Sequence, residues 1–167
     1  MQGKEEKREN IVGNCGAKWW KGGRNVFLGQ YEHALDDKGR LFMPAKLRDK
    51  LGANFVVTKG LDRCLFIYPM SEWESIEGKL QNLPFTKSDA RSFSRMFFSG
   101  AAECECDKQG RVNLPGSLRE YAQLEKETVI IGVASRVEIW GKERWVQYSE
   151  GTLDDYERIA EELEDVF

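Results

Sequence analysis

The sequence lacks several features that mark whole classes of protein. It has four cysteines and one histidine among 167 residues, and no window approaches the roughly 18 apolar residues of a membrane span. Four cysteines are too few for a disulfide scaffold in a chain of this length, and the N-terminal segment has no apolar core like that of a signal peptide. We therefore expect a cytoplasmic protein with no membrane partner.

A basic excess, which is common in proteins that bind nucleic acids, is also missing, since the net charge is −3. The acidity is concentrated at one end, because residues 150–167 contain eight acidic residues and one basic residue. Residues 26–149 are nearly neutral, with 18 basic and 17 acidic residues. Any anion-binding surface must therefore be local and built from a few placed side chains.

Motifs for metal binding and nucleotide binding are absent from the sequence as well. There is no phosphate-binding glycine loop and no dinucleotide fingerprint. Cys104 and Cys106 share one face of a predicted strand, but a zinc site would need two further ligands. His33 points to the same face of the predicted strand as Tyr31 and Leu35, which favours a packed strand face over a ligand. We expect no metal, no cofactor and no small-molecule substrate.

An acid pair offers the one enzymatic alternative. Asp36 and Asp107 occupy equivalent positions in the chain, as catalytic carboxylates sometimes do. Each has an arginine four residues later, Arg40 and Arg111, which would keep both carboxylates ionised instead of separating their pKa values. The pattern therefore argues against an enzyme.

The sequence does contain one motif that occurs twice. DDKGRLFMPAKLR at 36–48 returns 71 positions later as DKQGRVNLPGSLR at 107–119. Each copy predicts a strand, a tight turn at Lys38-Gly39 or Gln109-Gly110, a second strand, and a helix that starts at a proline. A further hairpin and a helix are predicted after each copy of the motif, so the predicted element order of each repeat is ββαββα. One such unit is too small to bury a good core alone, and two packed together would solve that problem.

The organisation along the chain follows from this repeat. The connecting helix contains the apolar run Phe93–Phe98, and the last helix begins with a capping box at Thr152 and Asp155. The first 25 residues have no partner in the repeat, and Lys-Gly-Gly before Val26 is compatible with a ribosome-binding sequence and a later start. We predict a disordered or non-native extension (1–25), a first repeat (26–82), a connecting helix (83–99), a second repeat (100–149) and an acidic C-terminal helix (150–167).

The doubled turns are the candidate functional site. Asp36 can pair with Arg40 across its turn, and Asp107 with Arg111, either to brace the turn alone or to position arginines for a ligand. A two-stranded β-ribbon fits the DNA major groove, and a guanidinium group matches guanine or phosphate oxygens in a bidentate manner. The residues that we expect to contact DNA are Lys38, Arg40, Lys46, Arg48, Lys108, Arg111 and Arg119.

The segment from Val26 to Arg48 and its second copy closely resemble the MraZ family of bacterial transcriptional regulators. That family has two tandem AbrB-like swapped-hairpin repeats, each with a D-x-x-x-R signature, and the likeness spans about residues 26–150. It implies sequence-specific binding to repeats near the promoter of a division and cell-wall gene cluster, including its own gene, and assembly into rings. By position, Asp36, Arg40, Asp107 and Arg111 carry the signature, while Gln109 in place of Lys38 makes the tip of the second hairpin less basic.

We therefore expect an α+β fold, in which two pseudo-symmetric ββαββα repeats form one intertwined β-barrel with flanking helices. The expected function is regulation of transcription by a nucleoid-associated, ring-like homo-oligomer that binds double-stranded DNA. An oligomeric scaffold that binds protein through the same hairpins is the alternative. The slope of affinity against salt separates the two, because phosphate contacts release counterions.

Overall fold

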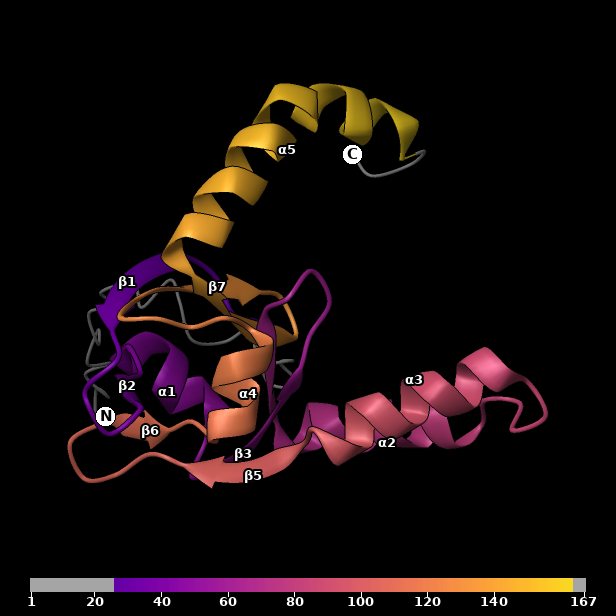
Figure 1. Ribbon diagram of the computed structural model, residues 1–167, viewed down its shortest axis with the longest axis horizontal. Helices are drawn as coiled ribbons and strands as arrows, with labels where there is room; N and C mark the ends of the chain where they lie inside the picture. Colours follow the sequence, from indigo (N-terminus) through magenta and orange to yellow (C-terminus); the bar gives the residue numbers. More distant parts are fainter. Residues whose placement is uncertain (1–25, 164–167) are drawn as a thin grey trace, which may run out of the picture.

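The computed structural model describes residues 26–163 of the chain. The expectation of a disordered or non-native extension at residues 1–25 lies outside this part. Within it, α-helices and antiparallel β-strands alternate in the predicted order, ββαββα, in both halves (Figure 1). The first half consists of β1 (Gln30–Ala34), β2 (Arg40–Phe42), α1 (Ala45–Leu51), β3 (Asn54–Lys59), β4 (Leu65–Pro69), α2 (Met70–Gln81) and α3 (Ser88–Ser99). The second half consists of β5 (Ala102–Glu105), β6 (Arg111–Asn113), α4 (Gly116–Tyr121), β7 (Glu127–Val133), β8 (Arg136–Gly141) and α5 (Lys142–Glu162).

The strands of the two halves are exchanged within one six-stranded antiparallel sheet. Its order is β1-β7-β8-β4-β3-β5. The first strand of each half lies at an edge and pairs with the later hairpin of the other half, so that β1 pairs with β7 and β5 pairs with β3. Neither half could keep these pairings alone, which explains why the chain carries the unit twice.

The prediction that the strands on either side of each repeated turn form a continuous β-hairpin is wrong. β1 and β2 meet at a single bridge, Leu35 with Leu41, and β5 and β6 meet at Cys106 with Val112. Instead β2 pairs with β6 as a separate two-stranded sheet. The ribbon therefore forms between the two halves of the chain, because the longer first strands find their partners in the large sheet.

The large sheet is covered on both faces, so its central strands β4 and β8 are almost wholly buried. On one face Phe55, Leu65 and Ile67 pack with α1, α4 and the β2–β6 ribbon. On the other face Phe66 and Tyr68 pack against residues of α2, α3 and α5. The ribbon is thus anchored on the main core from one side only, which leaves its other face to solvent.

The predicted boundary before the acidic helix is wrong. α5 runs without a break from Lys142 to Glu162, so residue 150 lies inside it. The hydroxyl of Thr152 does not cap a helix and instead donates a hydrogen bond to the carbonyl oxygen of Tyr148, one turn back (2.8 Å). A threonine inside a helix can satisfy its hydroxyl in this way. None of the helices in the described residues is both long and apolar enough to cross a membrane.

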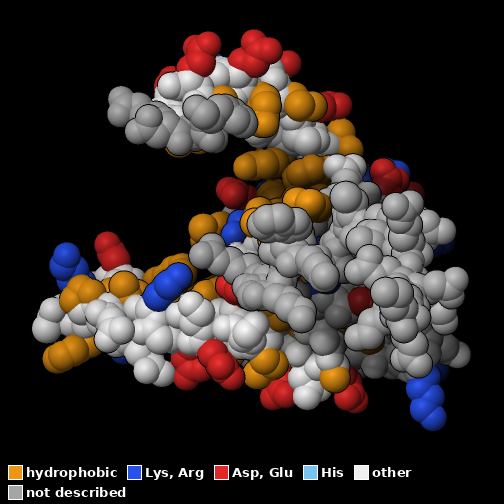
Figure 2. Space-filling view, turned by 180° about the vertical axis from the view of Figure 1, so that it is seen from behind, with side chains coloured by type: hydrophobic (Ala, Val, Ile, Leu, Met, Phe, Trp, Pro, Cys, Tyr) orange, Lys and Arg blue, Asp and Glu red, His pale blue; other side chains and the backbone are white. Residues whose placement is uncertain are grey.

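The helices outside the core form two arms. α2 and α3 lie side by side and project from the body, and α5 projects from the opposite end of the body toward the same side (Figure 1). Seen in the space-filling view, apolar side chains lie along both arms, and acidic side chains gather on the outer side of α5 (Figure 2). The arms therefore expose apolar surface away from the β2–β6 ribbon.

Candidate nucleic-acid interface

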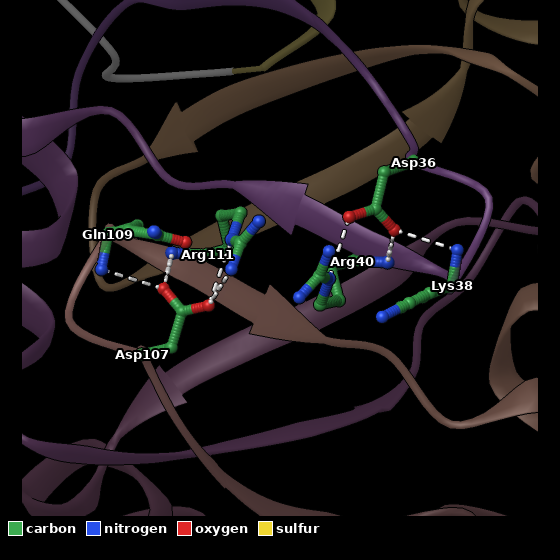
Figure 3. A network of polar contacts seen from close by, with 6 residues as sticks. All are labelled: Asp36, Lys38, Arg40, Asp107, Gln109 and Arg111. Carbon is green, nitrogen blue, oxygen red and sulfur yellow. Dashed lines mark hydrogen bonds and ion pairs between the residues drawn. The ribbon is translucent and has the colours of Figure 1, made fainter.

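The turn between β1 and β2 is held by one carboxylate. Oδ1 of Asp36 accepts hydrogen bonds from the amides of Lys38 and Arg40, each at 2.9 Å, and Oδ2 accepts one from Nε of Arg40 at 2.6 Å (Figure 3). The backbone closes the same turn, since the amide of Asp36 donates to the carbonyl oxygen of Arg40 (2.9 Å). The predicted pairing of Asp36 with Arg40 is confirmed, and it fixes the direction of the guanidinium group.

The turn between β5 and β6 repeats this arrangement. Oδ1 of Asp107 accepts hydrogen bonds from the amides of Gln109 and Arg111, each at 2.9 Å. Oδ2 accepts a hydrogen bond from Nε of Arg111 (2.8 Å) and forms an ion pair with its Nη2 (2.8 Å). The geometry does not depend on the residue at the tip, because Gln109 and Lys38 contribute only their backbone amides to it.

These contacts lower the pKa of both carboxyl groups. For Asp36 and for Asp107 the largest cause is the hydrogen bond from the amide of the arginine four residues later. The guanidinium group of the same arginine stabilises the charged form further. Both aspartates are therefore ionised at neutral pH, and each serves as a brace for its arginine, as the sequence indicated.

Gly39 and Gly110 join the two turns to each other. Both have positive φ, +74° and +79°, which a glycine adopts without strain. The carbonyl oxygen of Gly110 accepts a hydrogen bond from the amide of Met43 (2.8 Å), and that of Gly39 accepts one from Leu114 (3.1 Å). Each turn is thus tied to the strand of the other repeat.

The β2–β6 ribbon places the two braced arginines on one surface. Its register pairs Arg40 with Asn113, Leu41 with Val112 and Phe42 with Arg111. Leu41 and Val112 are fully buried, so the other four residues lie on the opposite, outward face. In the close view Arg40 and Arg111 lie over the neighbouring strands β2 and β6 (Figure 3). Two guanidinium groups from distant parts of the chain thus share one exposed face.

The arginines of the short helices lie closer to the turns than the sequence suggested. Arg48 of α1 covers Gly110, and its Cζ lies 6.0 Å from the centre of the Phe42 ring. Arg119 of α4 covers Gly39, and its Nε donates to the carbonyl oxygen of Leu114 (3.1 Å). Both side chains are half-buried. They are therefore packed across the repeats, and each supports the turn of the other half.

The predicted lysines are spread around this surface. Lys38 and Lys108 are exposed in the two turns, and Lys46 is exposed on α1. The repeated motif does not point to Phe42 and Asn113, which lie between the arginines on the outward face of the ribbon. Strand alternation combined with the 71-residue offset could have found them, because the two residues occupy equivalent positions in the two copies.

Chemically, the surface offers charge and hydrogen-bond donors in a fixed arrangement. The Nε edge of each ribbon arginine is held by its aspartate, and fixed guanidinium groups suit bidentate contacts to phosphate or to guanine. Residues 26–163 contain no group of three or more histidine, cysteine or acidic side chains placed to hold a metal ion. The arrangement fits an extended anionic partner.

Comparisons with known proteins agree with this geometry. The family model described as "MraZ protein, putative antitoxin-like" matches the chain twice, at residues 26–96 and 97–166. Proteins named "Transcriptional regulator MraZ" from Moorella thermoacetica and Heliobacterium modesticaldum are 59% and 61% identical over 140 residues, which is 84% of this chain and 98% of each relative. One from Pelotomaculum thermopropionicum is 60% identical over 141 residues, 84% of this chain and 97% of the relative. Their shared name describes a regulator and not an enzyme. Two matched repeats and this level of identity show that the chain belongs to the MraZ family.

Proposed function

We propose that the chain is a DNA-binding transcriptional regulator, and that the face formed by the two Asp-Arg turns and the β2–β6 ribbon contacts double-stranded DNA. The observation that carries the proposal is the convergence of Arg40 and Arg111, each braced by its own aspartate, on one exposed face. The name of the relatives, transcriptional regulator, supports the same function. Crossed strand pairing between the halves supports the swapped-hairpin barrel as the scaffold of this face.

Contacts to the backbone of DNA come from the charged groups around the ribbon. Arg40, Arg111 and the turn lysines Lys38 and Lys108 supply the positive charge. Lys46 on α1 extends the surface, while Arg48 and Arg119 act from above the opposite turns. Because the chain as a whole carries a net charge of −3, this local cluster must supply the attraction for phosphates. The first turn carries Lys38 at its tip where the second carries Gln109, so we expect Arg40 to contribute more than Arg111.

A ring-like homo-oligomer presents several such faces to repeated sites, and the two arms provide its interface. Leu153 and Tyr156 of α5 are 69% and 60% exposed, and Met96 of α3 is 58% exposed. Acidic residues flank the apolar stripe of α5, whereas α3 carries Arg91 and Arg95 at four-residue spacing and follows Lys87 at its N-terminal cap. Opposite charge beside apolar surface favours α5 of one copy packing on α3 of the next. A head-to-tail contact of this kind forms a ring when its rotation closes.

The target that we propose is repeated DNA upstream of the chain's own gene, in a division and cell-wall gene cluster, with the protein bound at the nucleoid. Weak contacts by single protomers add up in a ring, because each further contact becomes intramolecular after the first. Sites repeated at a regular spacing are therefore bound far more tightly than one isolated site.

A DNA titration tests the function directly. Fluorescent DNA from upstream of the gene is titrated with the wild type, Arg40→Ala, Arg111→Ala and a control, Arg158→Ala, whose guanidinium pairs with Asp155 and Glu162 on α5. We expect both ribbon variants to remain oligomeric and to lose most of their binding, Arg40→Ala more than Arg111→Ala, while the control binds normally. A double variant, Arg40→Ala with Arg111→Ala, that binds like the wild type would contradict the proposal.

A further inference from the structure

The outward face of the β2–β6 ribbon carries two kinds of residue. One diagonal holds Arg40 and Arg111, and the other holds Phe42 and Asn113. In the repeat, Arg40 and Arg111 are equivalent positions, and so are Phe42 and Asn113. The two repeats both have arginine at the first pair of equivalent positions. At the second pair, one repeat has phenylalanine and the other has asparagine. The charged side chains of the ribbon are therefore symmetric, whereas the uncharged side chains beside them are not.

Phe42 is exposed for an apolar residue, and yet it is held in place. Its side chain is 40% exposed. The ring of His33 lies against it at 5.2 Å between centroids, with Arg48 at 6.0 Å on another side. A Cβ built at Gly110 would lie 3.3 Å from its Cε2, so the ring also rests on the turn of the other repeat. A fixed apolar surface is thus presented to solvent between two arginines.

Asn113 occupies the matching position with unused hydrogen-bonding capacity. It is exposed and lies directly opposite Arg40 in the ribbon. Within residues 26–163 its side-chain amide has no hydrogen-bond partner. Its main chain is fixed by the register with β2, so the amide starts from a defined position on the surface.

We propose that Phe42 and Asn113 are the base-reading residues of this ribbon and that they read different bases, Phe42 a thymine methyl group and Asn113 an adenine. This inference rests on the proposed function and adds to it the residues that give specificity. Asparagine can pair in a bidentate manner with N6 and N7 of adenine, and an aromatic ring packs against the methyl group of thymine in the major groove. Since the two readers differ, one ribbon recognises a site that has a direction, although its arginines are symmetric.

The strand geometry sets the spacing of the two contacts. Diagonal neighbours on one face of an antiparallel pair lie about 7–8 Å apart. Base pairs in DNA follow each other every ~3.4 Å. The thymine and the adenine read by one ribbon should therefore lie about two base-pair steps apart.

Base analogues test this assignment without disturbing the protein. The probe is the shortest duplex from upstream of the chain's own gene that the wild type protects, and a scrambled duplex is the control. Thymines are replaced singly by uracil, which removes only the methyl group, and adenines singly by 7-deazaadenine, which removes N7. Wild type, Phe42→Ala, Asn113→Ala and Arg40→Ala are titrated against each duplex at several salt concentrations, with size-exclusion chromatography as the check on folding.

For the wild type we expect one thymine at which uracil weakens binding about fourfold. We also expect one adenine nearby at which 7-deazaadenine weakens binding about fivefold or more. The uracil effect should vanish in Phe42→Ala and the deaza effect in Asn113→Ala, as in a double-mutant cycle. Neither of these variants should change the salt slope or the binding to scrambled DNA, whereas Arg40→Ala should change both.

The alternative outcomes separate this inference from the proposed function. If the analogues weaken each variant as much as the wild type, or weaken none of them, the two residues do not read bases, while the loss in Arg40→Ala still supports DNA binding. If the wild type binds neither duplex, the proposed function itself fails and the inference fails with it.

Discussion

Arg119 lies directly over Gly39, a glycine that belongs to the turn of the other repeat. A Cβ at Gly39 would come within 2.5 Å of the guanidinium carbon of Arg119. The reciprocal contact exists between Arg48 and Gly110. Each short helix therefore holds down the turn of the opposite repeat, and the two Asp-Arg turns form one connected unit.

Replacing Gly39 by alanine should damage both stability and DNA binding. Its φ of +74° is unfavourable for alanine and costs about 1 kcal/mol or more, and the new methyl group displaces Arg119 from the turn that positions Arg40. We expect a lower midpoint of urea unfolding and a loss of affinity for the upstream DNA, measured by anisotropy.

Gly52 provides a matched control for this substitution. Its φ is +82°, so alanine is strained there too, but no atom of residues 26–163 lies within 4 Å of a Cβ at that position. Gly52→Ala should therefore lower the unfolding midpoint and leave DNA binding intact in the folded protein. If both variants bind DNA equally well, the contact between Arg119 and Gly39 has no part in the site.

Much of this fold was predictable, because repetition in the chain is a direct signal. The motif repeated at 36–48 and 107–119 correctly predicted both Asp-Arg pairs and the helices that follow Pro44 and Pro115. The alternation of apolar and polar residues predicts which face of a strand is buried, but it does not predict which other strand pairs with it. The pairing of β1 with β7 and of β2 with β6, and hence the position of the ribbon, therefore came only from the structure.

The contacts of Arg48 and Arg119 could not be predicted from the sequence for the same reason. Their positions on short helices identified them as exposed basic residues, but their half-buried contacts with glycines of the other repeat depend on the exchange of strands. The single helix α5 was missed for a local reason, since Thr152 suits a helix start in sequence and satisfies its hydroxyl inside a helix in the structure.

The braces make the protein sensitive to acid. The folded pKa values of Asp36 and Asp107 lie below the ordinary value of 3.8, so these groups stabilise the fold fully above that value. This contribution is lost as the pH falls from there through the lowered pKa values, because the folded state must then bind protons that it disfavours. We expect the urea midpoint of the wild type to drop steeply below pH ~4.

The variant Asp36→Asn with Asp107→Asn checks the origin of this acid sensitivity. Asparagine can still accept the amide hydrogen bonds of the turn but carries no charge for Arg40 and Arg111. We expect a less stable protein at neutral pH with a shallower loss of stability below pH ~4. A pH profile with the slope of the wild type would show that other carboxyl groups control the acid transition.

The buried carboxylate of Glu138 should be important for stability and not for DNA binding. Its side chain belongs to a residue that is 5% exposed, and it accepts hydrogen bonds from Nε of Arg136 (2.8 Å) and Nε1 of Trp140 (2.9 Å). Glu138→Ala leaves both donors without their acceptor, and we expect a loss of about 3 kcal/mol in the free energy of unfolding.

The exposed pair of Lys142 with Glu32, at 3.1 Å, is the control for this loss. Glu32→Ala should barely change the urea midpoint, because a solvated ion pair contributes little. Glu138→Gln should fall between the two, since it keeps an acceptor oxygen for Trp140. If Glu138→Ala unfolds at the same urea concentration as Glu32→Ala, the buried network does not stabilise the fold.

Disrupting the apolar stripe of α5 should separate assembly from DNA contact. Leu153 and Tyr156 are the most exposed apolar residues of that helix. The helix itself projects from the end of the body away from the β2–β6 ribbon (Figure 1). We expect Leu153→Asp with Tyr156→Asp to give a smaller species in light scattering, with an unchanged circular dichroism spectrum. Its affinity for a single site should match the wild type, whereas its advantage on repeated sites is lost because avidity requires the oligomer. Asp154→Ala, an exposed acidic residue on the side of α5 away from Leu153 and Tyr156, should retain the full mass. A double variant that keeps the wild-type mass would exclude α5 from the subunit interface and leave the DNA-binding face unaffected.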